Sequence, residues 1–300
     1  MIRYFLFIIF SVLCVNISAQ LPVKWEELSS AEFVSAVEKA EKVCIVPMGV
    51  IEKHGPYLPL ATDLLRARDI ACEAAKKEYA VVFPEYYFGQ MNEARHQPGV
   101  IAYSPDLILK LLEETCDEIA RNGFDKIIIL NAHGGNNGML SFFSMALLNK
   151  KHAYNVYFSD VTDLFPDAKS RKQVEEGYAK LPKGSMGHAG SDEASHVLSA
   201  RPDLYKKVDH DRADSGEDLN RLKNLTLVTT SVNWYAMFPN QYGGDASFAN
   251  KDLGDLMRKT FTDGFVKAIK EVKSDTVAPA LLKKFYDDAE HPIKTKQGRE

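Results

Sequence analysis

The chain has 300 residues, with 37 Lys and Arg against 41 Asp and Glu, which gives a formal net charge of −4 at pH 7. This balance argues against nucleic acid as a partner, because neutralising phosphates requires clustered Lys and Arg side chains. The length suits one large α/β domain or two smaller ones.

Residues 1–19 have the layout of a signal peptide. A single positive residue, Arg3, precedes an almost entirely apolar run over residues 5–15, and the small residue Ala19 stands before the expected cleavage point. The run is shorter than the ~20 residues that span a bilayer, so an uncleaved membrane anchor is the less favoured alternative. Cleavage removes Arg3 and leaves 36 basic and 41 acidic residues, a net charge of −5. We therefore expect an exported protein, periplasmic or secreted, with no stable membrane insertion after signal removal.

Short β-branched runs alternate with amphipathic helical stretches along the rest of the chain. In chain order, the pattern predicts a strand at 43–48, a helix at 64–77, a strand at 80–83, a helix from the Ser104 cap to Gly123, a strand at 126–130, a helix at 137–150, strands at 155–158 and 225–230, and a helix at 252–273. Continuous apolar strands between helices indicate a mostly parallel sheet covered by helices. A charged stretch at 206–224 is expected to be an exposed excursion, and residues 276–300 a polar C-terminal tail that is peripheral or frayed.

Three cysteines remain beyond the signal segment: Cys44, Cys72 and Cys116. Each lies in an apolar pattern, no pair has a CxxC spacing, and their odd number fits no complete disulfide framework. We expect buried thiols rather than a catalytic cysteine.

The first polar segment follows the strand at 43–48 and reads GVIEKHGPYLPLATD over residues 49–63. Glu52 and His54 are two residues apart, so in extended geometry they face the same way and can meet one cation or two neighbouring ones. Asp63 stands at the start of the next helix. The structural alternatives are a surface ion pair for Glu52 and His54, and a helix-terminus acid for Asp63.

Two further segments carry histidine and carboxylate. NAHGGNN at 131–137 follows the strand at 126–130 and places His133 before two glycines, which let the backbone approach a ligand. HAGSDEASH at 188–196 places His188 and Glu193 five residues apart across a turn and a helix start. The structural alternatives are a loop histidine at His133 and a first-turn acid at Glu193, and His196 is interpreted as a surface or packing histidine. Because ligands bind beyond the carboxyl ends of parallel strands, we expect the candidate side chains to converge at that edge.

The combined donor set holds imidazole nitrogens and carboxylate oxygens without a thiolate, which suits zinc or manganese. A carboxylate such as Asp63 can bridge two ions about 3.5–4 Å apart that hold a hydroxide and polarise a carbonyl. Such a centre requires no Ser or Cys nucleophile.

The segments at 49–63, 131–137 and 188–195 resemble, in order and spacing, the three signature blocks of the creatininase (creatinine amidohydrolase) family. The resemblance runs from about Trp25 to Lys273. It implies a single three-layer α/β/α domain, here residues 20–275, with a mostly parallel central sheet. It also implies two divalent metal ions per chain, Zn or Mn, and hydrolysis of cyclic or linear amide-type C–N bonds. Many members are homohexamers, so the resemblance implies a homo-oligomer here.

Carried over by position, the resemblance implies metal ligands at Glu52, His54, Asp63 and His133, with Asp63 bridging. Glu193 resembles a carboxylate of the same centre. His188 resembles the histidine proposed to shuttle protons to the leaving nitrogen.

Departures from the family pattern bear on the substrate. Gly135 stands where creatinine-hydrolysing members carry a glutamate ligand, so the resemblance points to an HGGN-type branch and away from creatinine. Tyr57 stands where many members have His, and Ala194 replaces a Thr. The region at 88–101 matches only loosely, and the family's Glu-His pair appears as Glu93-Ala94. Candidate substrate-binding residues are Tyr57, Asn136, Arg95, His96 and Trp234; Arg95 and His96 are equally explained as loop residues, and Trp234 as core.

The sequence thus predicts a metal-dependent hydrolase that cleaves an amide or cyclic amide C–N bond of a small molecule with a metal-bridging hydroxide. His188 is the expected general acid toward the leaving nitrogen. The alternatives are hydrolysis of a sugar-derived ketone at a C–C bond, and a non-catalytic metal-binding protein on the same fold.

Overall fold

The computed structural model describes residues 21–206, 208 and 215–298, so the predicted signal peptide lies outside the described residues. Four strands form one parallel sheet in the order β2-β1-β3-β4. They are β1 (Val43–Met48), β2 (Val81–Val82), β3 (Lys126–Asn131) and β4 (Asn155–Asp160). The predicted parallel α/β sheet is confirmed.

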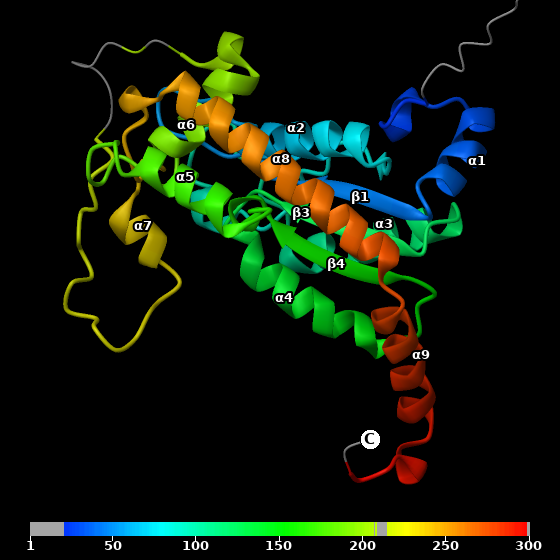
Figure 1. Ribbon diagram of the computed structural model, residues 1–300. Helices are drawn as coiled ribbons and strands as arrows, with labels where there is room; N and C mark the ends of the chain where they lie inside the picture. Colours follow the sequence, from blue (N-terminus) through cyan, green and yellow to red (C-terminus); the bar gives the residue numbers. More distant parts are fainter. Residues whose placement is uncertain (1–20, 207, 209–214, 299–300) are drawn as a thin grey trace, which may run out of the picture.

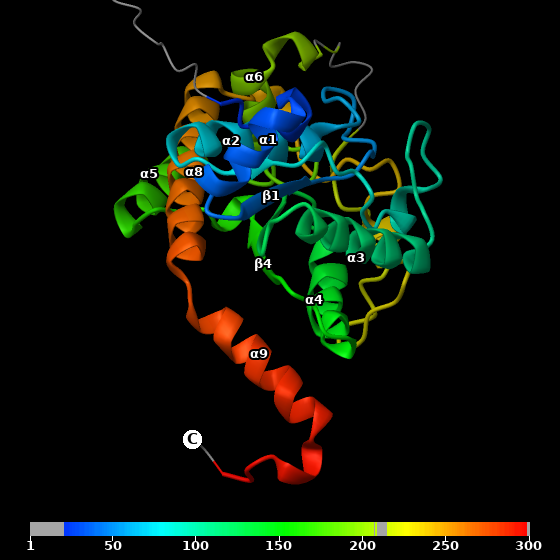
Figure 2. The ribbon, with the colours of Figure 1, turned by 90° about the vertical axis from the view of Figure 1, so that its right-hand side faces the viewer.

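Helices cover both faces of this sheet, which gives the three-layer architecture (Figures 1 and 2). One layer holds α2 (Thr62–Lys77) and α8 (Lys251–Ser274), which pack on each other and with α5 (Ala168–Tyr178) and α6 (Ser191–Ala200). The other layer holds α3 (Pro105–Arg121) and α4 (Asn136–Ala146). This distribution is what right-handed crossovers require, since the connection through α2 runs toward β2 and those through α3 and α4 run the opposite way.

The core follows from the sequence pattern, because the central strands are apolar on both faces. All six residues of β1 are buried, as are the last five of β3. Helix α2 turns Ala67, Ile70 and Ala71 toward them, all fully buried. The three cysteines are free and buried, as predicted.

Three more helices complete the described chain. The first is α1 (Ser30–Lys39), the second the short α7 (Asn233–Met237), and the third α9 (Val277–Glu290). Helix α9 forms most of the predicted C-terminal tail and projects away from the sheet (Figure 2). Its Tyr286 is buried, and the hydroxyl donates to the Leu147 carbonyl. No described helix combines the length and the apolar character that crossing a bilayer demands.

The predicted strand at 225–230 is wrong. This segment forms an exposed loop in which Leu227 is 95% accessible. Its β-branched, alternating composition favours a pleated surface only where a neighbouring strand or a core covers one face. In the described chain the sheet ends at β2 and β4, so that segment has no such neighbour.

Candidate metal centre

The loops that follow β1 and β3 begin side by side. The two strands pair in parallel with Met48 opposite Asn131, and the Ala132 N–H donates to the Met48 carbonyl at 3.0 Å. The loop after β1 carries Glu52 and His54, while the loop after β3 carries His133. The strand register therefore brings two separate sequence segments to one point at the carboxyl edge.

A close backbone contact adds the start of α2 to the same point. An added Cβ at Gly49 would stand 2.4 Å from the backbone nitrogen of Leu64. Only glycine allows the loop to pack this closely on the helix terminus. Asp63, the second residue of α2, consequently lies beside Glu52 and His54.

Two groups of side chains meet here and share Asp63. His133 Nδ1 lies 2.9 Å from Glu52 Oε1 and 3.1 Å from Asp63 Oδ2. His54 Nε2 lies 3.2 Å from Asp63 Oδ1 and 3.6 Å from Glu193 Oε2. Each group offers three ligand atoms within reach of one cation. The two oxygens of Asp63 thus face different groups, as a bridging carboxylate would.

The histidines are oriented as metal-binding imidazoles usually are. His133 Nε2 donates to the Gln90 carbonyl at 3.0 Å, and His54 Nδ1 lies 3.3 Å from the Glu52 carbonyl. These contacts give each outer ring nitrogen a hydrogen-bond acceptor and point the inner nitrogens at the carboxylates.

Two buried carboxylate oxygens support the fit to a cation. Glu52 Oε1 and Asp63 Oδ2 are inaccessible to solvent, and neither accepts a hydrogen bond from the described residues, although His133 Nδ1 lies close to both. An unpartnered buried carboxylate oxygen is costly unless a cation compensates it. The donor set of carboxylates and imidazoles fits divalent zinc or manganese.

The histidines and carboxylates of the cluster shift each other's pKa values. Burial opposes the charged form of His54, but the carboxylates of Asp63, Glu52 and Glu193 outweigh burial and raise its pKa to about 10. Burial likewise opposes ionisation of Asp63, and the two histidines nevertheless hold its pKa well below the usual range. The carboxylates therefore concentrate negative potential at the point where the two groups meet.

Arg66 is a member of this site that the sequence did not reveal. It lies one helical turn after Asp63, is only 2% exposed, and donates from Nη1 to Glu193 Oε1 at 2.8 Å. The other oxygen of Glu193 accepts the Ala189 N–H at 2.8 Å. Both contacts fix the Glu193 carboxylate at the start of α6. A spacing of three residues from Asp63 on one helix was the available signal.

A cavity of about 680 Å³ opens beside the cluster. Its walls include Glu52, His133 and Glu193, and also His188 and Trp234. His188 Nε2 donates to the Lys53 carbonyl at 3.0 Å and lies 3.6 Å from Glu52 Oε2. The Trp234 ring meets the His188 ring edge-on, at 5.5 Å between centroids. The cavity is large enough for a small-molecule ligand.

The other candidate substrate-binding residues lie elsewhere. Asn136 is fully buried and accepts the Gln90 N–H at 2.9 Å, so it braces the loop that carries Gln90. Arg95 is exposed, and His96 bonds the Pro239 carbonyl at 2.7 Å. Neither is among the described residues that line the 680 Å³ cavity.

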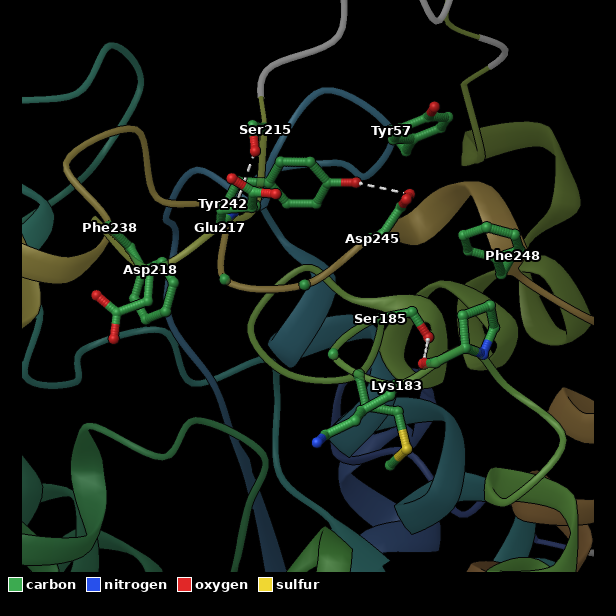
Figure 3. Close-up of a pocket in the computed structure, with 16 residues that line it drawn as sticks. Tyr57, Lys183, Ser185, Ser215, Glu217, Asp218, Phe238, Tyr242, Asp245 and Phe248 are labelled. Atoms are coloured by element: carbon green, nitrogen blue, oxygen red, sulfur yellow. Dashed lines mark hydrogen bonds between the residues drawn. The ribbon is translucent and has the colours of Figure 1, made fainter. Parts of the chain in front are cut away.

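Tyr57 lines a different cavity, of about 800 Å³, which shares no described lining residue with the 680 Å³ cavity. Figure 3 shows Tyr57 there together with Tyr242 and Asp245, whose side chains are hydrogen-bonded to each other. The substrate roles predicted for Tyr57, Asn136, Arg95, His96 and Trp234 stay predictions, as do the ligand roles of the cluster.

A parallel α/β sheet whose carboxyl edge carries clustered histidines and carboxylates is typical of α/β enzymes with a site at that edge. Within that class the chain belongs to the creatininase family: a family model described as creatinine amidohydrolase matches residues 26–269. Members of this family are amidohydrolases, so the protein is a hydrolase of C–N bonds.

Relatives with known activities are similar to this chain over different lengths. Creatinine amidohydrolase of Pseudomonas putida is 23% identical over 264 residues, which cover 82% of this chain and 95% of that protein. The mycofactocin precursor peptide peptidase of Mycolicibacterium smegmatis is 33% identical, over 31% of this chain and 39% of its own length. A 2-amino-5-formylamino-6-ribosylaminopyrimidin-4(3H)-one 5′-monophosphate deformylase of Methanobrevibacter smithii is 29% identical, over 33% of this chain and 43% of its own length.

Solved creatininase structures share the fold. One creatinine amidohydrolase superposes with a TM-score of 0.70 at 21% identity, covering 86% of this chain and all of that one. Two others, described as a Zn-Zn type and as creatininase Mn, each have a TM-score of 0.68 at 21% identity and cover 84% of this chain and 99% of their own. The candidate cluster lies in the region that the family model matches.

Proposed function

We propose that the protein is a metal-dependent amidohydrolase that acts with two divalent ions, zinc or manganese, on an amide or cyclic amide. The observation that carries this proposal is the position of the Asp63 carboxylate between two histidines. One of its oxygens faces His54 and the other faces His133. Creatininases described with zinc or with manganese share the fold, and the relatives include a deformylase and a peptidase. All three relative types act on C–N bonds.

Glu52 and His133 would hold one ion, His54 and Glu193 the other, and Asp63 both. Such a pair of ions supplies an activated water and polarises the scissile carbonyl. The protein's own contribution is to fix these ligands through backbone contacts and to exclude bulk water, since four of the five are nearly inaccessible.

His188 is the proposed proton donor to the leaving nitrogen. It lies on the cavity wall beside Glu52, and the Lys53 carbonyl and the Trp234 ring hold its orientation. An imidazole nitrogen can both donate and accept a proton, which suits general acid–base catalysis.

Two variants separate metal binding from proton transfer. We expect His133→Ala to lose bound metal and activity together, because it removes an inner nitrogen of one group. His188→Ala should keep two ions per chain and lower kcat by about 10²-fold or more. Metal content by plasma mass spectrometry and turnover of amides, lactams and formamides measure the two effects. A His188→Ala protein with unchanged kcat would contradict the assigned role. A wild type that is loaded with zinc or manganese and hydrolyses none of the amides, lactams or formamides would contradict the function.

A further inference from the structure

The wall of the 680 Å³ cavity is acidic beyond the cluster itself. Glu93, Asp160 and Asp192 line it in addition to the proposed ligands. Among the described lining residues, Arg66 is the only Lys or Arg, and its Nη1 already donates to Glu193. Away from the proposed metal ions, a substrate carboxylate or phosphate would therefore meet acidic side chains on this wall and no described Lys or Arg other than Arg66.

Glu93 is the carboxylate best placed to contact a substrate. Its Oε2 accepts a hydrogen bond from Gln90 Nε2 at 2.8 Å, while no described residue donates to Oε1. A Cβ at Gly135 would stand 3.1 Å from Glu93 Oε1 and 2.4 Å from His133 Nε2. Gly135 has no side chain, so Glu93 Oε1 lies against its backbone, beside the proposed ligand His133. By contrast, Asp160 is engaged, because it accepts bonds from Thr162 and Asn131.

Trp234 supplies an aromatic surface to the same cavity. Its indole N–H donates to Gln241 Oε1 at 2.7 Å and is therefore occupied. Trp234 thus contributes its aromatic ring to the cavity wall. An aromatic ring together with an available carboxylate is the combination that recognises an ammonium group.

Arg95 and His96, the two basic residues that the sequence suggested for substrate binding, do not line this cavity. His96 bonds Pro239 and packs on Tyr235, and Arg95 is exposed outside the lining. The observations on charge, on Glu93 and on Trp234 all point the same way.

We propose that the substrate is an amide that carries an ammonium group near the scissile carbonyl, and that Glu93 is the residue that selects this charge. The inference rests on the proposed function, because the proposed function places the scissile bond at the metal cluster. It excludes substrates whose neighbouring group is a carboxylate or a phosphate.

The test uses three matched hydroxamates, which chelate active-site metal ions and need not be hydrolysed. They derive from 3-aminopropanoic acid, 3-hydroxypropanoic acid and succinic acid, so they differ only in an ammonium, hydroxyl or carboxylate end group. Calorimetry on the zinc-loaded enzyme should show the ammonium compound binding about tenfold more tightly than the hydroxyl compound, and the carboxylate compound more weakly than either.

Glu93→Gln should reduce the ratio of ammonium to hydroxyl affinity to near one while leaving the hydroxyl affinity unchanged. Glu85→Gln removes the same charge from an exposed residue outside the cavity and should keep the wild-type ratio. Trp234→Leu should reduce the ratio by a few-fold without abolishing it. A preference for the carboxylate compound, or an unchanged ratio in Glu93→Gln, would overturn the inference while leaving the amidohydrolase standing; failure of all three compounds to bind would overturn both.

Discussion

Two side chains of α2 have different contacts at the carboxyl edge of the sheet. Asp63 faces two imidazoles, and Arg66 on the next turn of α2 contacts the Glu193 carboxylate from the far side. Burial opposes the charged form of Arg66, but the charges of Glu193, Asp192 and Asp63 outweigh it and raise the pKa of the guanidinium. A buried guanidinium in this place neutralises part of the acidic cluster and fixes the direction of Glu193.

We expect Arg66→Met to lower the bound metal from two ions to about one per chain, because Glu193 loses the contact that orients it and one group of ligands depends on it. Arg66→Lys should restore part of the second ion. Plasma mass spectrometry of dialysed protein measures the stoichiometry. Arg68→Met, on the same helix but bonded to Phe83 and Glu26, is the control and should keep two ions. Retention of two ions in Arg66→Met would show that Glu193 is positioned without it.

The side chains that gather in the cluster could be named from the sequence, including Asp63 and Glu193 at helix starts, although their ligand roles stay predictions. Glu52, His54 and His133 could be grouped because parallel strands end at one edge. The contact between Arg66 and Glu193 joins residues 127 positions apart, and the space above Gly135 is filled by Glu93 from another loop. Neither contact leaves a pattern in the local sequence, because each joins residues that are far apart along the chain.

Helices α2, α6 and α8 are joined by one partly buried polar cluster. Arg258 on α8 donates twice to Asp69 on α2, at 2.6 Å each, and His196 on α6 lies 3.5 Å from the same carboxylate. Burial opposes ionisation of Asp69, yet the neighbouring His196 and the Arg258 guanidinium lower its pKa to about 2. Burial chiefly lowers the pKa of His196, so this histidine favours its neutral form.

The sign of the pH effect follows from these directions. The pKa of Asp69 is lower in the folded protein than in the unfolded chain, so its stabilisation is present above about pH 4 and is lost as pH falls toward about 2. We expect Asp69→Asn to lower the free energy of unfolding at pH 7 by about 2 kcal/mol. The difference from wild type should shrink between about pH 4 and pH 2. Urea denaturation across this range measures it.

A matched control is available outside this cluster. Asp203 accepts two bonds from Arg201 at an exposed position, so Asp203→Asn should change stability far less than Asp69→Asn does at any pH. An equal effect of the two substitutions would contradict the Asp69 cluster as a link between the helices.

Elements with a strong hydrophobic period could be predicted, and those stabilised by tertiary contacts could not. The apolar strands β1 and β3 and the long helices α2, α3 and α8 lie within a few residues of their predicted positions. Helix α1 was missed, although its capping box of Ser29 and Glu32 is a local signal. The segment at 225–230 has the composition of a strand and no partner, which a single sequence does not reveal.

The whole molecule is the shared family fold with additions at both ends. The family model matches residues 26–269, so α9 lies beyond it, and the predicted signal peptide precedes it. Export and a hexameric assembly stay predictions.

We expect the protein made in a bacterial host to be recovered outside the cytoplasm and to begin at about Gln20. The apolar run of residues 5–15 would direct export, and the small residue Ala19 would allow cleavage. Intact-mass measurement and N-terminal sequencing of the periplasmic fraction check this. Ala19→Trp should block cleavage and retain residues 1–19. Recovery of uncleaved wild-type chain in the cytoplasm would contradict the export signal.

The in-register pairing of β1 with β3 has a consequence for how this protein tolerates change. Successive residues of a strand point to opposite faces, so inserting or deleting one residue within β3 would turn His133 away from Glu52 even if every ligand were kept. Substitutions at the ligands and length changes in the strands should therefore be equally damaging, whereas α9, outside the shared fold, can be lengthened or shortened without moving the catalytic edge.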